Sequence, residues 1–259
     1  MTTLVFDIET IPDVALGRRL YGLEGIPDED VARVMAFQQM QETGTEFLPP
    51  HQQRIVAISV ALRRQDQLQV WSLGEPGDSE QEIVRRFFEG IDKYTPDLVS
   101  WNGSGFDLPV LQYRAMLHGV VSQRYWDTGD EDREFRFNNY LSRFHWRHID
   151  LMDVLSGFQG RGRASLDGMA TLLGFPGKLG MDGSKVWEAW RAGQIAAIRA
   201  YCETDVMNTW LVFLRFQLIR GHLDGKAHAA ELARVRAFLG QADKPHWREF
   251  DAAWQAAGG

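Results

Sequence analysis

The chain has 259 residues, of which 44% are hydrophobic and 24% charged, a composition typical of a globular protein with a sizeable core. Its formal net charge of −7 excludes a uniformly basic nucleic-acid clamp, although acids that hold cations also count toward that total. The single Cys202 excludes an internal disulfide framework, no apolar leader opens the chain, and no apolar run approaches membrane-spanning length. We therefore expect a cytoplasmic protein without membrane contact. The length predicts one domain over 1–259, with a core over about 1–220 and a helical extension over about 226–259.

The first hundred residues predict a strand, a polar stretch, a hairpin and a helix. Residues 3–6 (TLVF) begin a strand, and residues 12–50 are polar and helical in part. The runs RIVAISVALR and QLQVWSLG flank a short polar link at 63–66, a pattern typical of a hairpin. Ser79 and Glu82 form a capping-box pattern before the helical run IVRRFFEGI.

The rest of the chain mixes short strands with helices. DLVSWNG predicts a buried strand and GFDLPVLQYRAMLHG a helix with Pro109 in its first turn. HIDLMDVL predicts a strand that passes into a helix, and SLDGMATLLG a short helix closed by Gly174. Residues 193–221 form either one helix or two joined end to end, and one or two further helices follow. This mixture indicates an α/β layered domain with a partly antiparallel sheet.

Residues 133–149 (REFRFNNYLSRFHWRHI) combine arginines with aromatic residues. The alternation in REFRFNNYL predicts strand pairing, with at least half of the aromatic rings in the core. The same mixture also suits contact with a nucleic-acid single strand, through phosphates and stacked bases. The next acid, Asp150, is expected to cap the following helix. The alternative is that it supports, from behind, the candidate site described below.

Three groups of residues carry candidate chemistry. Asp7 and Glu9 in FDIET point to the same face because a strand alternates its side chains. Two adjacent carboxylates repel each other unless a cation lies between them, and a divalent ion is the obvious candidate. Asp107 follows a strand at a helix start, and Tyr201 and Asp205 in YCETD share one helix face.

Each group also has an ordinary explanation when taken alone. Asp7 and Glu9 are compatible with a solvated strand end, and Asp107 forms a capping-box pattern with Ser104. Tyr201 and Asp205 are compatible with a surface face of a helix. Asn102 either favours the turn after its strand or lies along a nucleic-acid groove. Only the ordered combination of all three groups favours a single site.

The three groups resemble, in order and spacing, the exonuclease motifs of the proofreading domain of family B DNA polymerases. Asn102, Phe106 and Asp107 match the pattern N-x-x-x-F-D, and Tyr201 and Asp205 match Y-x-x-x-D. No polymerase sequence follows, so the chain resembles the stand-alone, polymerase-B-like 3'-5' exonucleases of bacteria. Tyrosine in the third motif places it in the DEDDy subclass of the DnaQ-like, ribonuclease H-like superfamily.

The resemblance implies a ribonuclease H-like fold, in which helices flank a central mixed sheet of about five strands. It also implies two divalent ions, Mg²⁺ or Mn²⁺. Asp7 would bridge both ions, Glu9 and Asp205 would hold the water-bearing ion, and Asp107 would support the second ion. Tyr201 would orient the attacking water. The residues expected to bind substrate are Ile8, Thr10, Asn102 and Phe106, with Lys178 as a candidate phosphate contact.

The expected function is metal-dependent 3'-5' exonucleolysis of single-stranded nucleic acid, with DNA as the first choice and nucleoside 5'-monophosphates as products. Trimming of RNA 3' ends stays open, because the same carboxylates serve both polymers. A nucleic-acid-binding protein without catalysis is the alternative of another class. A replication or repair partner that activates the protein would dock on residues 12–50 or on the C-terminal helices.

Overall fold

Within residues 2–258, which the computed structural model describes, five strands form one mixed sheet with the N-terminal strand at its centre. The strands are β1 (Thr3–Pro12), β2 (Gln53–Arg64), β3 (Gln67–Ser72), β4 (Asp97–Ser100) and β5 (His148–Asp150). β1 and β2 pair antiparallel, as do β2 and β3, whereas β4 runs parallel to β1 and β5 runs parallel to β4. The strand order is β3-β2-β1-β4-β5. This arrangement confirms the α/β class and the mixed sheet of the ribonuclease H-like fold.

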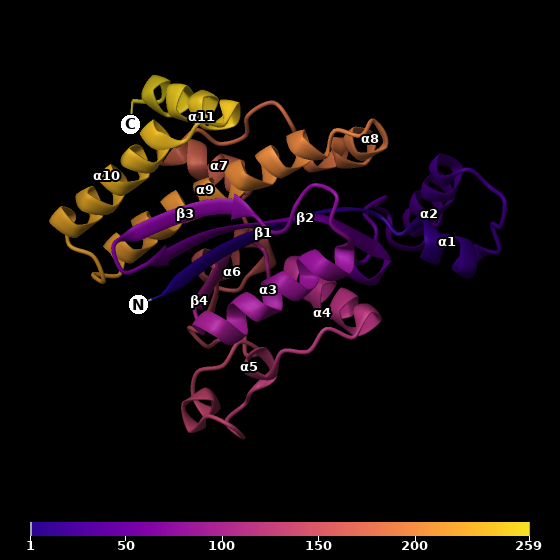
Figure 1. Cartoon of the computed structure of the whole chain (residues 1–259), viewed down its shortest axis with the longest axis horizontal. Helices are drawn as coiled ribbons and strands as arrows, with labels where there is room; N and C mark the ends of the chain where they lie inside the picture. The colour runs from indigo at the N-terminus through magenta and orange to yellow at the C-terminus, as the bar shows by residue number, and fades with distance from the viewer. Residues whose placement is uncertain (1, 259) are drawn as a thin grey trace.

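Helices cover both faces of this sheet (Figure 1). The helices are α1 (Val14–Tyr21), α2 (Asp28–Thr43), α3 (Glu80–Tyr94), α4 (Asp107–His118), α5 (Gln123–Trp126), α6 (Leu151–Leu155), α7 (Leu166–Leu172), α8 (Val186–Arg191), α9 (Ile195–Ile219), α10 (Gly225–Gln241) and α11 (Pro245–Ala256). Short 3-10 turns lie at η1 (Pro50–Gln52), η2 (Arg133–Arg136), η3 (Gly160–Gly162) and η4 (Gly183–Lys185). α3 and α4 pack on one face, and α9 packs on the other with α7, α10 and α11 beside it. α1 and α2 project beyond the end of β1 (Figure 1).

Alternation along β1 divides the buried side chains between two cores. Leu4, Phe6 and Ile8 pack with residues of α3 and α4, whereas Val5 packs with residues of α9. Asp7 and Glu9 follow Val5 at intervals of two residues, so they share its side of the strand. The central strand therefore presents its two acids to α9, the helix that carries the third motif.

Most of the predicted elements are confirmed. Residues 12–50 hold α1 and α2, and β2 and β3 form the expected hairpin around Gln65. The Ser79 hydroxyl accepts a hydrogen bond from the Glu82 amide at 3.2 Å and so caps α3. α9 is a single helix of 25 residues, which decides between the two alternatives for 193–221. Two helices, α10 and α11, follow it.

The prediction for residues 133–149 is wrong in two respects. The stretch REFRFNNYL forms the 3-10 turn η2 and irregular loops instead of a strand. Of the five Phe, Tyr and Trp rings in residues 133–149, two are buried (Phe135, Tyr140) and three are exposed (Phe137, Phe144, Trp146). The cause is local, since the Asp132 and Asn139 side chains bond to backbone groups of this segment. Such bonds replace the ladder that a strand would need.

Candidate active site

β1 supplies the first two acids at the point where its pairing with β2 changes. Asp7 lies opposite Ser59 and Glu9 opposite Ala57, and a β-bulge follows between Glu9 and Thr10. Glu9 is buried and Asp7 is half-buried. A bulge re-aims the side chains beside it, and bulges are common next to functional sites. Both acids therefore lie on the central strand, which is paired on both sides by β2 and β4.

The start of α4, directly after the loop that follows β4, supplies the third acid. α4 begins at Asp107, whose buried carboxylate accepts a hydrogen bond from the Ile8 amide at 3.2 Å. This contact joins the second motif directly to the first, across 99 residues of sequence. The capping box with Ser104 is wrong, because α4 has no side-chain cap at its start.

Asp150 holds the same loop in place from β5. Its two carboxylate oxygens accept from the Asn102 and Ser104 amides, each at 2.9 Å. One of these oxygens also accepts from the first amides of α6, which confirms the expected helix cap. Asn102 adopts a positive φ of 65°, a turn conformation that asparagine tolerates better than most residues. The sequence alone indicated only the cap, since the bonds to the loop cross 46 to 48 residues.

α9 supplies Tyr201 and Asp205, both of them buried. Burial excludes the ordinary explanation that the pair forms a surface face. Between them on the same helix, the Cys202 sulfur lies 3.6 Å from a carboxylate oxygen of Asp7 and 3.4 Å from its backbone carbonyl. The structure therefore brings together residues from β1, α4 and α9, which are the three sequence motifs.

Burial raises the pKa of all four carboxyl groups. The pKa of Asp107 is raised to about 7 and that of Asp205 to about 6, with burial as the main cause for both. Burial, followed by repulsion from the neighbouring acids, raises the pKa of Asp7 and Glu9 well above their ordinary values. The Lys178 ammonium partly opposes this effect at Glu9 and Asp205.

This donor set fits divalent cations. Candidate ligand atoms of Asp7, Glu9 and Cys202 lie within 4.8 Å of one another. Carboxylate oxygens are the ligands that Mg²⁺ and Mn²⁺ favour, and a bound cation would relieve the repulsion among them. The Cys202 thiol is a different case, because burial and the nearby Asp7 raise its pKa and keep it protonated. A protonated thiol is no ligand for a hard cation.

The expected substrate contacts occupy different environments around these acids. The Ile8 side chain is buried in the core, and the Thr10 hydroxyl donates to the Gln53 side chain at 2.9 Å. Phe106 is half-buried, and Lys178 is exposed. These contacts stay predictions for this chain.

Phe47 was missed by the sequence reasoning. Its ring lies 5.2 Å from the Phe106 ring, centroid to centroid, and 62% of the residue is exposed. It comes from the link between α2 and η1, and its contact with Phe106 spans too long a stretch of sequence for any local pattern to indicate it.

Comparison with known protein families matches residues 45–254 to a family model. It is described as a predicted 3'-5' exonuclease related to the exonuclease domain of PolB. The chain belongs to this family. The match includes Asp107, Tyr201 and Asp205, whereas Asp7 and Glu9 lie ahead of its first residue. A search of curated proteins found no match.

Membership makes the protein a hydrolase of phosphodiester bonds whose substrate is a nucleic acid. Exonucleases of the DnaQ-like type generally depend on metal ions, in agreement with the donor set described above. Across residues 2–258, none of the helices combines the length and the hydropathy that a membrane span requires.

Proposed function

We propose that the protein is a two-metal-ion exonuclease that shortens single-stranded DNA from its 3' end and releases nucleoside 5'-monophosphates. One observation carries this proposal. Four carboxylates converge from β1, α4 and α9, and in the described part of the chain no Lys, Arg or His forms an ion pair with any of them. Like charges that are buried together call for a cationic ligand from outside the chain.

Asp7, Glu9, Asp107 and Asp205 would hold the ions. When bound, two such ions activate a water molecule and neutralise the charge that develops on the leaving oxygen. The chain itself contributes position, because Asp107 is tied to the Ile8 amide and Asp150 fixes the loop before it. Such support matters, since small misplacements of reacting groups cost large factors in rate.

Tyr201 would orient the attacking water as a hydrogen-bond donor. Burial, followed by the charges of Asp205 and Glu9, raises the pKa of the phenol above its ordinary value. The hydroxyl therefore keeps its proton at neutral pH and is a poor general base. It lies beside Asp205 on the same helix face, where it can donate to a water close to that carboxylate.

The 3' end of the substrate would lie against Phe106 and Phe47, whose rings form a partly exposed aromatic pair next to Asp107. Base–aromatic stacking tolerates any sequence, which suits an exonuclease that advances through every base. Ile8 and Thr10 flank Glu9 on β1, and Asn102 lies in the loop that ends at Phe106. The exposed Lys178 ammonium faces the acids and is placed to meet a phosphate.

The test uses DNA and RNA single strands of matched sequence, labelled at the 5' end, with Mn²⁺ or with EDTA. We expect the wild-type protein to give a ladder that shortens from the 3' end with Mn²⁺ and no products with EDTA. Asp7→Ala should lower the rate by at least about 1,000-fold, since several kcal/mol of stabilisation depend on the ions it holds. Asp130→Ala is the matched control, because Asp130 is an exposed acid outside the site.

The outcomes of this assay identify the substrate and test the mechanism. The polymer that is degraded faster is the preferred substrate, and faster loss of RNA would overturn the choice of DNA. Intact oligonucleotides with Mn²⁺ present, from a folded wild-type protein, would replace the proposal with a binding role. Products that shorten from the 5' end, or equal rates for Asp7→Ala and Asp130→Ala, would also contradict it.

A further inference from the structure

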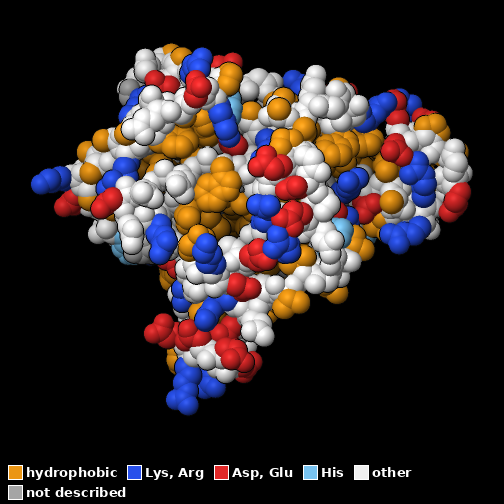
Figure 2. All heavy atoms as spheres, in the orientation of Figure 1, with side chains coloured by type: hydrophobic (Ala, Val, Ile, Leu, Met, Phe, Trp, Pro, Cys, Tyr) orange, Lys and Arg blue, Asp and Glu red, His pale blue; other side chains and the backbone are white. Residues whose placement is uncertain are grey.

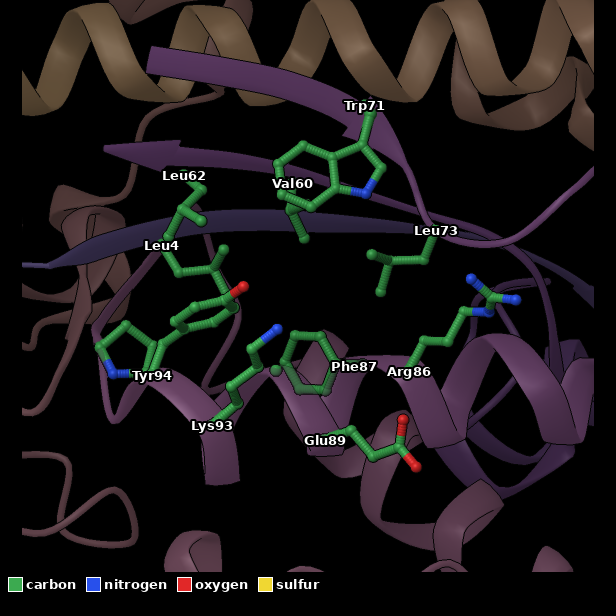
Figure 3. Close-up of a pocket in the computed structure, with 12 residues that line it drawn as sticks. Leu4, Val60, Leu62, Trp71, Leu73, Arg86, Phe87, Glu89, Lys93 and Tyr94 are labelled. Atoms are coloured by element: carbon green, nitrogen blue, oxygen red, sulfur yellow. The ribbon is translucent and has the colours of Figure 1, made fainter. Parts of the chain in front are cut away.

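A hollow of about 200 Å³ opens between the edge strand β3 and helix α3, on the face of the sheet opposite to Asp7 and Glu9. Its walls are mostly apolar, and its lining includes Leu4, Val60, Leu62, Trp71, Leu73 and Phe87. Figure 3 shows Trp71 and the aliphatic side chains reaching down from the strands toward Phe87 on α3. In Figure 2 the same region appears as exposed hydrophobic surface near the centre of the visible face, with basic side chains along its lower left margin.

The hollow stays open because α3 carries a glycine where it faces the strands. Gly90 lines the hollow, and a Cβ atom built there would meet nothing within 4 Å. Its φ lies outside the left-handed region, so the helix itself does not require glycine at this position. Phe87 and Ile91 anchor the same turns of α3 in the core. A glycine that no backbone strain explains leaves room for a group from outside.

The charge that is free at the mouth of the hollow is positive. The Lys93 ammonium and the Arg64 guanidinium lie over the Tyr94 ring, at 5.0 and 5.4 Å from its centroid. Neither has an ion-pair partner among residues 2–258. Glu89, the acid at the rim, forms an ion pair with Arg85 instead. This local excess of cations contrasts with the chain as a whole, whose net charge is −7.

We propose that this hollow binds an acidic segment of a partner protein, which inserts one large apolar side chain beside Trp71. The partner's carboxylates would then meet Lys93 and Arg64 at the rim. The volume lies below the range of roughly 300–1,000 Å³ that small-molecule sites occupy, so one side chain fits better than a whole cofactor. A nucleobase fits less well, because its polar edges would lack partners against an aliphatic wall.

The position of the hollow keeps this binding separate from the candidate active site. Leu4 lines the hollow from the α3 face of β1, whereas Asp7 and Glu9 occupy the α9 face. A bound segment would therefore leave the acids open to substrate. The proposal stands whether or not the exonuclease mechanism proposed above is right.

The probe is a short fluorescent peptide of Asp and Glu residues around one central Trp. Two companion peptides replace the Trp by Ala, or the acids by Asn and Gln. Fluorescence anisotropy in EDTA should show that the acidic Trp peptide binds below about 1 mM, and that each companion binds at least about tenfold more weakly. Added salt should weaken binding, because exposed charges are screened.

Two variants locate the peptide. Gly90→Leu fills the hollow from a helical position with open space, so it should preserve the fold and weaken binding at least about tenfold. Gly240→Leu is the matched control, since Gly240 also lies in a helix, α10, with open space around it. Lys93→Gln should weaken binding a few-fold, whereas Lys226→Gln at another exposed lysine should not.

Three results would overturn the proposal. The first is no binding of the acidic Trp peptide up to about 1 mM, where binding is worth only about 4 kcal/mol. The second is equal binding by Gly90→Leu and Gly240→Leu. The third is displacement of the peptide by a single-stranded oligonucleotide that itself loses affinity in Gly90→Leu, which would assign the hollow to nucleic acid.

Discussion

Two groups of buried and half-buried acids differ in whether the chain pairs them with a cation. Asp13 and Glu80 share the guanidinium of Arg114, which lies 2.6 Å from the Asp13 carboxylate, and all three side chains are buried. Glu80 also accepts from the Ile55 amide at 2.7 Å. This group, here named the Arg114 group, satisfies its charges within the chain.

The second group, made of Asp7, Glu9, Asp107 and Asp205, brings no such cation. Lys178 influences two of these acids from an exposed position, yet it forms no ion pair with them within 4.0 Å in the described residues. Acids that serve the fold and acids that serve a ligand therefore differ in whether the chain supplies a cation to them. An acid kept for structure is paired by the chain, because an unpaired buried charge is costly. An acid kept for a bound cation is left without an ion-pair partner from the chain.

Breaking the Arg114 group should give the largest effect on stability. Arg114→Ala leaves Asp13 and Glu80 buried without their cation, and should lower the free energy of unfolding by about 3–5 kcal/mol. Urea unfolding with EDTA present measures this change. Arg33→Ala is the control, because Arg33 makes only exposed ion pairs, which are worth about 0–1 kcal/mol. A loss as small as that of the control would mean that the Arg114 group is not structural.

In the same measurement, Asp7→Asn should not lower the free energy of unfolding, in contrast to Arg114→Ala. The substitution keeps the size of the side chain and removes one of several like charges, so stability in EDTA should stay equal or rise. A loss comparable to that of Arg114→Ala would show that Asp7 is paired within the chain after all.

The parts of the fold that local rules govern could be predicted from the sequence. Strand alternation placed Asp7 and Glu9 on one face, and helical spacing did the same for Tyr201 and Asp205. The cap by the Ser79 hydroxyl was predicted correctly because its bond spans only three residues, whereas the Glu82 carboxylate bonds to Arg85 and Arg86. The order and spacing of the three motifs then predicted that these acids share one site, because that order is typical of one fold.

Contacts that span long stretches of sequence could not be predicted in this way. The bond from the Ile8 amide to Asp107 and the contact between Cys202 and Asp7 depend on how β1 meets α4 and α9. No pattern within one segment encodes either contact. The prediction for residues 133–149 was wrong because a local pattern was misleading. A few residues alternate as they would in a strand, but the side chains of Asp132 and Asn139 accept hydrogen bonds from nearby backbone amides.

The stability gained from an added cation should depend on pH, because the cation competes with protons for the unpaired acids. The raised pKa values of Asp107 (about 7) and Asp205 (about 6) mean that the folded state binds more protons than the unfolded chain above about pH 4. Stability without metal therefore falls as the pH rises from about 4 to 7. Mn²⁺ should restore it, by about 2.7 kcal/mol at one hundred times its dissociation constant.

Thermal melts with Mn²⁺ and with EDTA check this at about pH 5.5 and about pH 8, on either side of the raised pKa values. The increase in Tm should be larger at the higher pH, where the carboxylates are free of protons, and should shrink in Asp7→Asn. Arg33→Ala should keep the full increase, since Arg33 lies outside both groups. Equal increases at both pH values would mean that the ion binds elsewhere.

The smallest expected effect concerns Tyr201, which lies among the unpaired acids without being one of them. Tyr201→Phe removes only the hydroxyl, so the Mn²⁺-dependent increase in Tm should stay as in the wild type. The rate should fall by about 100-fold, the loss expected when one positioned hydrogen-bond donor is removed. Because burial raises the phenol pKa, a donor role also predicts that wild-type activity does not rise between about pH 8 and 10. A rise in that range, absent from Tyr201→Phe, would instead make Tyr201 a general base, since ionisation would then create the active form.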